Sequence, residues 1–194
     1  RDIYAAGAVQ PGDEDDYFQS SLFTIARRRI LWLLILVLAN GLTTKVIAMN
    51  DQILKDVVLL AAFIPLLIGT GGNVGAQSST VVIRGLSTQK IKSLGAIKAV
   101  VKEAITGALL GVLMMIVVFP FAWWQGEGPL IAYAVGISLI SITTLAATTG
   151  AILPLLFDRM RLDPALMSSP FITTVTDIAG VFIYLSTASW LLSS

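Results

Sequence analysis

Residues 104–124, AITGALLGVLMMIVVFPFAWW, decide the fold of this chain because they contain no charged side chain and end on two tryptophans. About 20 predominantly apolar residues are enough for a helix to cross the hydrocarbon core of a bilayer. Four further stretches are long and almost free of charge: residues 30–49, 57–83, 130–156 and 167–192. The sequence therefore predicts an all-α membrane protein with five transmembrane helices per subunit.

The overall composition agrees with a membrane protein and excludes several kinds of site. Hydrophobic residues make up 56% of the chain and charged residues only 13%, against about a quarter charged in soluble domains. A net charge of +1 leaves no basic stripe for nucleic acid. Because the chain has no Cys and no His, disulfides, thiolate ligands and imidazole ligands are excluded, and a metal ion would be bound by oxygen.

The basic residues predict the orientation in the membrane. When the chain is threaded through five crossings, eleven of its 13 Lys and Arg residues, Lys90 and Lys92 among them, fall on one side, and only Lys45 and Lys55 fall on the other. Cytoplasmic loops carry the excess of positive charge in membrane proteins. We therefore expect a cytoplasmic N-terminus and an external C-terminus.

The first 29 residues differ from the rest. They include a Pro11-Gly12 turn and an acidic cluster at residues 13–16, which is typical of a solvated linker. We interpret residues 1–29 as a cytoplasmic connecting segment and residues 30–194 as the five-helix transmembrane domain.

The second span contains the run GTGGNVGAQSS at residues 69–79. Glycine disfavours a helix by about 1 kcal/mol per interior position, so we expect irregular backbone here, which at membrane depth must line a water-filled cavity or be buried in protein. The alternative is that the glycines allow two helices to pack closely. In the fourth span, six Ser and Thr residues between 138 and 149 predict either a wet face or hydroxyls bonded to their own backbone.

The fifth span is the most informative. Asp163-Pro164 resembles a helix start, and Pro170 is expected to restart or kink the helix. Helical spacings of three and four then predict one polar, small-residue face, made of Thr173, Thr174, Asp177, Gly180 and Tyr184.

Asp177 is the candidate functional residue because a carboxylate inside a membrane is rare and usually functional. No Lys or Arg lies in the interior of a predicted span, with Lys45 close to the end of the first. Three interpretations remain open: Asp177 binds a transported cation, carries a proton, or stays protonated in a structural role.

The motif Asp163-Pro164-Ala165-Leu166-Met167-Ser168-Ser169-Pro170-Phe171, the Thr-rich approach to Asp177 and the glycine-rich run at 69–77 resemble the MgtE family of bacterial magnesium channels. The beginning of the chain and the run Arg27-Arg28-Arg29-Ile30-Leu31-Trp32-Leu33 resemble the same family. The resemblance implies a homodimer in the bacterial inner membrane with a pore at or near the two-fold axis, gated by cytosolic CBS domains that this sequence lacks.

The resemblance also implies site residues. Asp177 matches the family's pore aspartate, and Thr173 matches a position that contributes to the Mg²⁺ site through its backbone. Ala76 and Ser169 stand where some members have Asn, which favours Asp177 and Asn73 over a wider ligand set. The expected pore lining is Asn73, Gly72, Thr174, Gly180 and Ser169.

The expected function is passive transport of hydrated Mg²⁺ by a channel, not an enzymatic reaction. The first alternative is a proton-coupled divalent-cation transporter. An intramembrane hydrolase is disfavoured because an aspartyl mechanism needs two facing carboxylates and a serine dyad needs a His. A scaffold for the cytosolic domains would carry no ion flux.

Overall fold

Long helices joined by short connections make up the described part of the chain. A computed structural model describes residues 22–89, 91, 95–125 and 128–193, leaving aside the side chains of residues 24, 25, 28, 29, 31, 32, 35, 56 and 165–169. The helices are α3 (Leu22–Met49), α4 (Asp51–Asp56), α5 (Leu59–Ser87), α7 (Ala96–Trp124), α8 (Pro129–Arg159) and α9 (Pro164–Leu192). The all-α prediction is thus confirmed for these residues. Residues 1–21, which include the acidic cluster at 13–16, and Lys90 and Lys92 lie outside them.

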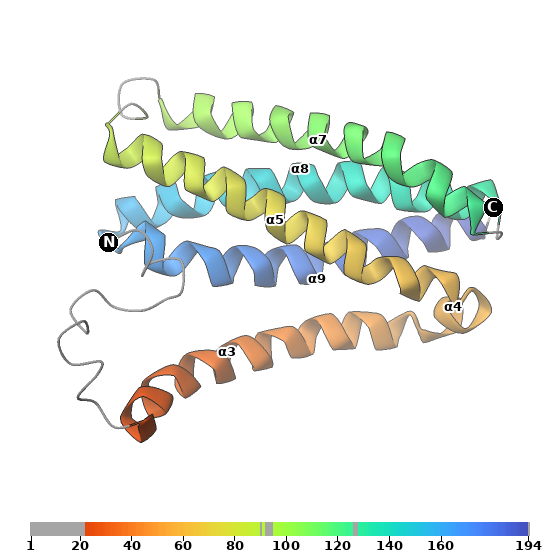
Figure 1. Cartoon of the computed structure of the whole chain (residues 1–194), viewed down its shortest axis with the longest axis horizontal. Helices are drawn as coiled ribbons and strands as arrows, with labels where there is room; N and C mark the ends of the chain where they lie inside the picture. The colour runs from red at the N-terminus through yellow and green to blue at the C-terminus, as the bar shows by residue number, and fades with distance from the viewer. Residues whose placement is uncertain (1–21, 90, 92–94, 126–127, 194) are drawn as a thin grey trace.

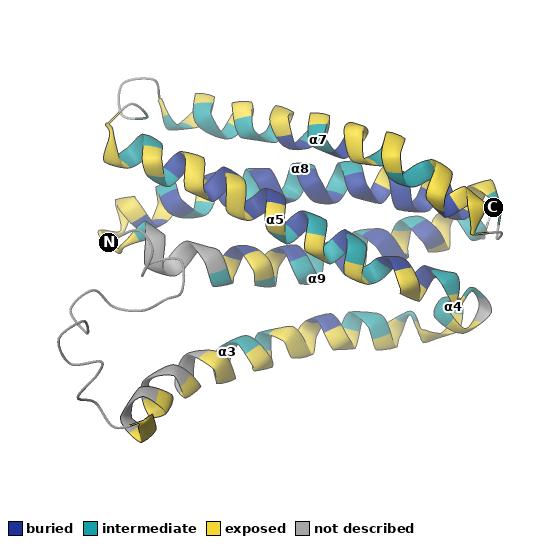
Figure 2. Cartoon of the chain, viewed as in Figure 1, coloured by how far each residue is buried: buried dark blue, intermediate teal, exposed yellow. Residues whose placement is uncertain are grey.

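Helix α8 is the centre of the bundle. It packs against α7, α5 and α9, and α5 also packs against α9, whereas α3 lies on the outside of the bundle against α9. Figure 2 shows α8 dark blue along most of its length and α7 mainly exposed. The buried residues of α7 are Gly107, Gly111 and Ala122, all of them small. Helix α7 therefore presents most of its apolar surface outward.

Four helices, α5, α7, α8 and the Pro170–Leu192 part of α9, are long and apolar enough to cross a membrane. They coincide with four of the five predicted spans. The described apolar part of α3, Leu36–Met49, is shorter, so the fifth crossing stays a prediction. Helix α7 begins eight residues before its apolar stretch, after Gly95 at φ +90°. An apolar run fixes the membrane crossing, and the helix continues into the charged flank.

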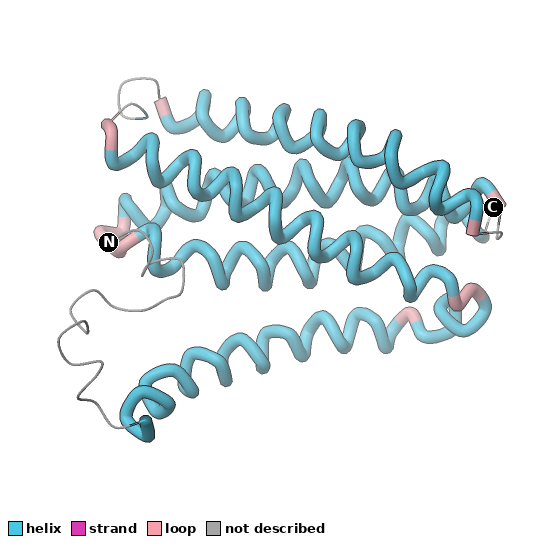
Figure 3. Tube along the Cα trace, in the orientation of Figure 1, coloured by secondary structure: helices cyan, strands magenta, loops and turns pink. Residues whose placement is uncertain are grey.

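The prediction of irregular backbone in the second span is wrong. Helix α5 runs without a break from Leu59 to Ser87, through Pro65 and through the whole glycine-rich run, as the continuous tube in Figure 3 shows. The alternative, close packing, describes the glycines better. A Cβ atom on Gly75 would lie 2.5 Å from Ile172 Cγ2 and 3.3 Å from the Ala146 carbonyl oxygen, and a Cβ on Gly150 would clash with the Gly75 backbone.

The core divides into two parts along the bundle. The half that contains the start of α5 and the end of α9 is filled by large side chains, such as Leu60, Phe63, Leu139 and Leu185. The second cluster of buried hydrophobic residues has few members, Val74, Ala146 and Ala147, and lies further along α5. Small residues bring the helices of this part close together, because backbones can approach only where side chains are short.

A buried hydrogen bond joins α9 to the first turns of α5. The Tyr184 hydroxyl donates to the Leu60 carbonyl oxygen at 3.1 Å, and both residues are fully buried. Tyr184 thus belongs to the core, although the sequence placed it on the same polar face as Asp177.

Removing the Tyr184 hydroxyl tests how much this hydrogen bond between α9 and α5 stabilises the fold. Tyr184→Phe keeps the ring and deletes the donor, so we expect it to lower the free energy of unfolding by about 1 kcal/mol, the usual net value of a buried hydrogen bond. Circular dichroism during titration with a denaturing detergent measures the change.

Tyr133→Phe is the matched control, because Tyr133 is 46% exposed on α8. It should leave the midpoint unchanged. Equal effects of the two substitutions would show that the Tyr184 hydroxyl contributes nothing specific.

Candidate functional site: the polar face of α5 and α9

Asp177 lies thirteen residues into α9, about 20 Å from the helix start at 1.5 Å per residue. Helix α9 begins at Pro164, directly after Asp163 as predicted, and continues through Pro170. The Asp177 side chain is partly buried. Asp177 forms no ion pair with a described Lys or Arg, and the ion pair of Lys55 with Asp51 lies at the far end of the bundle.

Two contacts show how α5 lies beside the part of α9 that contains Thr173 and Asp177. A Cβ on Gly71 would lie 2.5 Å from Thr176 Cγ2, and a Cβ on Gly72 would lie 3.9 Å from Thr173 Cγ2. The two helices are antiparallel, so moving one turn along α9 from Thr173 to Asp177 moves one turn back along α5. Asp177 is therefore level with Gly69 and its neighbours, and Asn73 is level with Thr173.

One side of α5 carries polar and small residues that are not covered. Asn73 and Gln77 are exposed and stand four residues apart, on one face of the helix. A Cβ on Gly69, four residues before Asn73, would meet nothing within 4 Å. Gln77 belongs to this stripe but was not among the predicted site residues, although its spacing from Asn73 would have identified it.

The other predicted site residues lie at different depths of the bundle. Thr173 is exposed and donates its hydroxyl to the Pro170 carbonyl oxygen at 3.0 Å, and Thr174 is partly buried. Gly180 is buried, and a Cβ there would lie 3.6 Å from two carbons of Ile142 on α8. The Ser169 side chain lies outside the described residues. The structure thus brings Gly72, Asn73, Thr173 and Asp177 to one region, with Gly180 packed behind them.

The hydroxyl groups of α8 are mostly satisfied by their own helix. Thr143, Thr144 and Thr148 donate to the carbonyl oxygens of Leu139, Ile140 and Thr144 at 2.6–2.7 Å. Ser141 likewise donates to the Ile137 carbonyl oxygen at 3.0 Å, whereas the buried Ser138 hydroxyl has no hydrogen-bond partner among the described residues. These contacts favour the backbone-bonded interpretation over a wet face, and they leave α5 and α9 as the source of the polar surface.

The described residues contain no cluster of acidic side chains around Asp177. No group of three or more Asp and Glu side chains that could hold a metal ion occurs among the described residues. Among the described residues of this face, Asp177 is the acidic one, and the amide oxygen of Asn73 and the hydroxyl oxygen of Thr173 are neutral. Mg²⁺ is commonly bound through one or two carboxylates while it retains several waters, so the chemistry of the face suits a hydrated divalent cation.

Comparison with known sequences places the chain in a family. A family model described as a divalent cation transporter, MgtE, matches residues 64–187. The chain belongs to the MgtE family. It is also 37% identical over 193 residues to the magnesium transporter MgtE of Thermus thermophilus, covering 100% of this chain and 42% of that protein.

Two further relatives are similar along most of the chain. The magnesium transporter MgtE of Bacillus subtilis is 32% identical over 177 residues, 91% of this chain and 39% of that protein. The one of Enterococcus faecalis is 34% identical over 168 residues, 84% of this chain and 36% of that protein. The chain spans about two fifths of the length of these relatives. The MgtE match includes the face that contains Gly72, Asn73, Thr173 and Asp177.

Gly71 and Gly72 provide a matched test of the packing behind this face. Gly71→Ala places a Cβ 2.5 Å from Thr176 Cγ2 and 2.7 Å from Ile142 Cγ2, and β-branched side chains in helices cannot rotate away easily. We expect a loss of about 1–3 kcal/mol in unfolding free energy, as for other overpacked sites. Detergent-induced unfolding followed by circular dichroism measures the loss.

Gly72→Ala makes only ordinary van der Waals contact at 3.9 Å and gains helix propensity. It should be as stable as the original chain or slightly more so. Equal stability of the two variants would mean that α5 does not pack against α8 and α9 as described.

Proposed function

We propose that this chain forms the membrane-spanning part of a passive Mg²⁺ channel, with the ion path along the polar face of α5 and α9. The observation that carries the proposal is Asp177, a carboxylate near the middle of α9 with no described basic partner. An unpaired intramembrane carboxylate is costly. A cation that passes through the site would balance its charge.

Two copies of the chain would complete the site. One Asp177 supplies a single negative charge, whereas a homodimer with the pore near its two-fold axis supplies two, which balances one Mg²⁺. The exposed side chains of Asn73, Gln77 and Thr173 support this arrangement because they would otherwise face lipid. In a dimer they would face the ion's water shell and bond to it.

The proposed selectivity follows from the charge and the hydration of the ion. Mg²⁺ dehydrates reluctantly, so amide, hydroxyl and backbone oxygens are expected to contact its waters, while the Asp177 carboxylates attract the ion directly or through water. Binding must also be weak enough for release, which contact through water favours. A monovalent ion gains less from two carboxylates and would not displace Mg²⁺.

The proposed setting is the bacterial inner membrane, with the ends of α5 and α8 facing the cytoplasm. Arg84 and Arg159 lie in the last turns of these helices, and Arg161 follows α8. This proposal rests on the distribution of the described basic residues, of which only Lys45 and Lys55 lie at the other end. Residues 1–29 would then connect the membrane domain to cytosolic regulatory CBS domains of a longer chain.

Asp177→Asn tests the proposed role of the carboxylate. It keeps the side-chain volume and removes one charge per subunit. We expect Mg²⁺ flux into proteoliposomes and Mg²⁺ affinity measured by calorimetry each to fall by at least tenfold, because the neutral amide attracts a divalent cation far less. Competition by monovalent ions should increase at the same time.

Asp158→Asn is the control, because Asp158 is exposed near the end of α8 and its loss removes the same charge. Its flux should equal that of the original chain. Unchanged Mg²⁺ flux and affinity in Asp177→Asn would contradict the proposal. Flux that follows an imposed pH gradient and stops without one would instead favour the proton-coupled transporter.

A further inference from the structure

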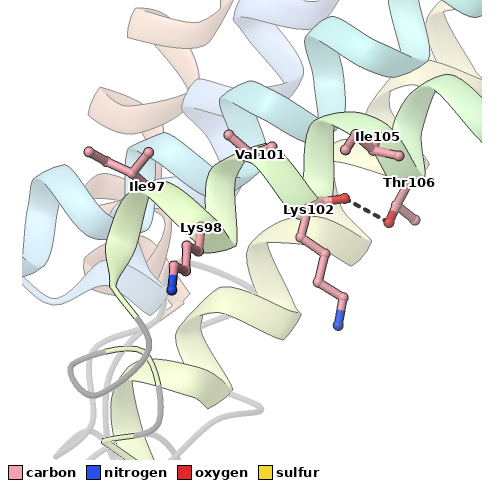
Figure 4. Close-up of a pocket in the computed structure, with 6 residues that line it drawn as sticks. All are labelled: Ile97, Lys98, Val101, Lys102, Ile105 and Thr106. Atoms are coloured by element: carbon pink, nitrogen blue, oxygen red, sulfur yellow. Dashed lines mark hydrogen bonds between the residues drawn. The ribbon is translucent and has the colours of Figure 1, made fainter.

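The outward surface of α7 carries a shallow pocket near the start of the helix. Ile97, Lys98, Val101, Lys102, Ile105 and Thr106 line it. Figure 4 shows the two lysine side chains extending from the same side of α7, one turn apart, with Ile97, Val101 and Ile105 forming an apolar row beside them. The two lysines and the apolar row of Ile97, Val101 and Ile105 therefore lie side by side on the outer surface of the bundle.

The apolar row continues into the membrane-spanning part of α7. Ile97 is 80% exposed, Val101 51% and Ile105 65%, and Leu109 extends the row at 59%. The tryptophans at the other end of α7, Trp123 and Trp124, are also exposed. Lys102 and Trp123 are 21 residues apart, roughly 30 Å along a helix, which is the thickness of the hydrocarbon core. Lys98 and Lys102 are thus at headgroup depth if α7 crosses the bilayer.

Neither Lys98 nor Lys102 forms an ion pair with a described residue. Their i, i+4 spacing is that of a like-charge pair, which destabilises a helix. The acidic residue nearest to them in the sequence is Glu103, which directly follows Lys102. Because i, i+1 neighbours on a helix do not face each other, Glu103 does not lie between the two lysines. The described ion pair, Lys55 with Asp51, lies on α4 at the opposite end of the bundle. An anion between Lys98 and Lys102 would relieve their repulsion.

We propose that this surface binds an anionic phospholipid, whose phosphate lies between Lys98 and Lys102 and whose acyl chains lie along Ile97, Val101, Ile105 and Leu109. A soluble acidic protein would use the lysines but would leave the apolar row uncovered. A zwitterionic lipid would cover the apolar row without supplying a net negative charge. The inference rests on α7 spanning the membrane and is independent of Mg²⁺ conduction.

Native mass spectrometry tests the binding directly. The chain is prepared in nonionic detergent micelles with equal amounts of phosphatidylglycerol and phosphatidylcholine, and the retained lipids are counted. The original chain should retain phosphatidylglycerol preferentially. Lys98→Gln together with Lys102→Gln should lower that preference at least about fivefold, since a basic residue near an anionic surface contributes about that factor.

Two matched variants separate a specific site from general attraction. Arg84→Gln with Arg159→Gln removes two exposed positive charges from the same end of the bundle and should change the preference less than twofold. Lys98→Arg with Lys102→Arg keeps both charges and should retain it. An equal loss in the arginine-to-glutamine variant, or no preference in the original chain, would overturn the proposal.

Free phosphate provides the last comparison. Inorganic phosphate shares the charge of the headgroup but has no acyl chains, so millimolar phosphate should not displace phosphatidylglycerol from the original chain. Complete displacement would show that the lysines bind phosphate alone and that the apolar row takes no part, which would also overturn the proposal.

Discussion

The close approach of α5 to α8 and α9 is the constraint on which the rest of the structure depends. Gly75 meets Ile172 and the Ala146 backbone, and Gly150 meets the Gly75 backbone with no room for a side chain. Between membrane helices there is little hydrophobic driving force, because lipid is as apolar as the helix surface, so dense packing of small residues supplies much of the attraction. Larger residues here would move α5 away from α9 and change the setting of Asp177.

The same stretch of α5 serves two purposes on two sides. Gly71, Val74 and Gly75 are buried, whereas Asn73, Ala76 and Gln77 are exposed. A straight helix separates these roles because residues three and four apart share a face. Gly71 and Gly75 hold α5 against α8 and α9, and the polar residues lie on the side of α5 that these contacts leave open.

Much of the fold could be predicted from the sequence, because membrane crossings depend on local apolar runs. Four of the predicted spans coincide with long helices, and the helix start at Pro164 was expected. The glycine-rich run was misinterpreted because helix propensities are measured in water, where an open backbone can bond to solvent. In a bilayer, breaking the helix would leave backbone groups unpaired at a cost of several kcal/mol each, which outweighs the propensity of glycine.

The sequence singled out Asp177 as the candidate site residue, but it could not predict which of the neighbouring residues are buried and which are exposed. Asp177 stood out because carboxylates are rare in spans. Periodicity alone could not show that Gly180 packs against Ile142 or that Tyr184 bonds to Leu60, since those contacts depend on how helices far apart in sequence are arranged. Gln77 was missed although its four-residue spacing from Asn73 places both side chains on one face of α5.

The central claim is that the exposed face of α5 beside Asp177 contacts water and not lipid. The chain has no cysteine, so a single cysteine can be placed at Asn73 and, as a lipid-facing reference, at Val112, which is 41% exposed midway along α7. The rate of modification by a charged, membrane-impermeant thiol reagent in proteoliposomes measures access to water. We predict rapid modification of Asn73→Cys, slowed by Mg²⁺, and little modification of Val112→Cys. Equally slow modification of both, unaffected by Mg²⁺, would contradict the account.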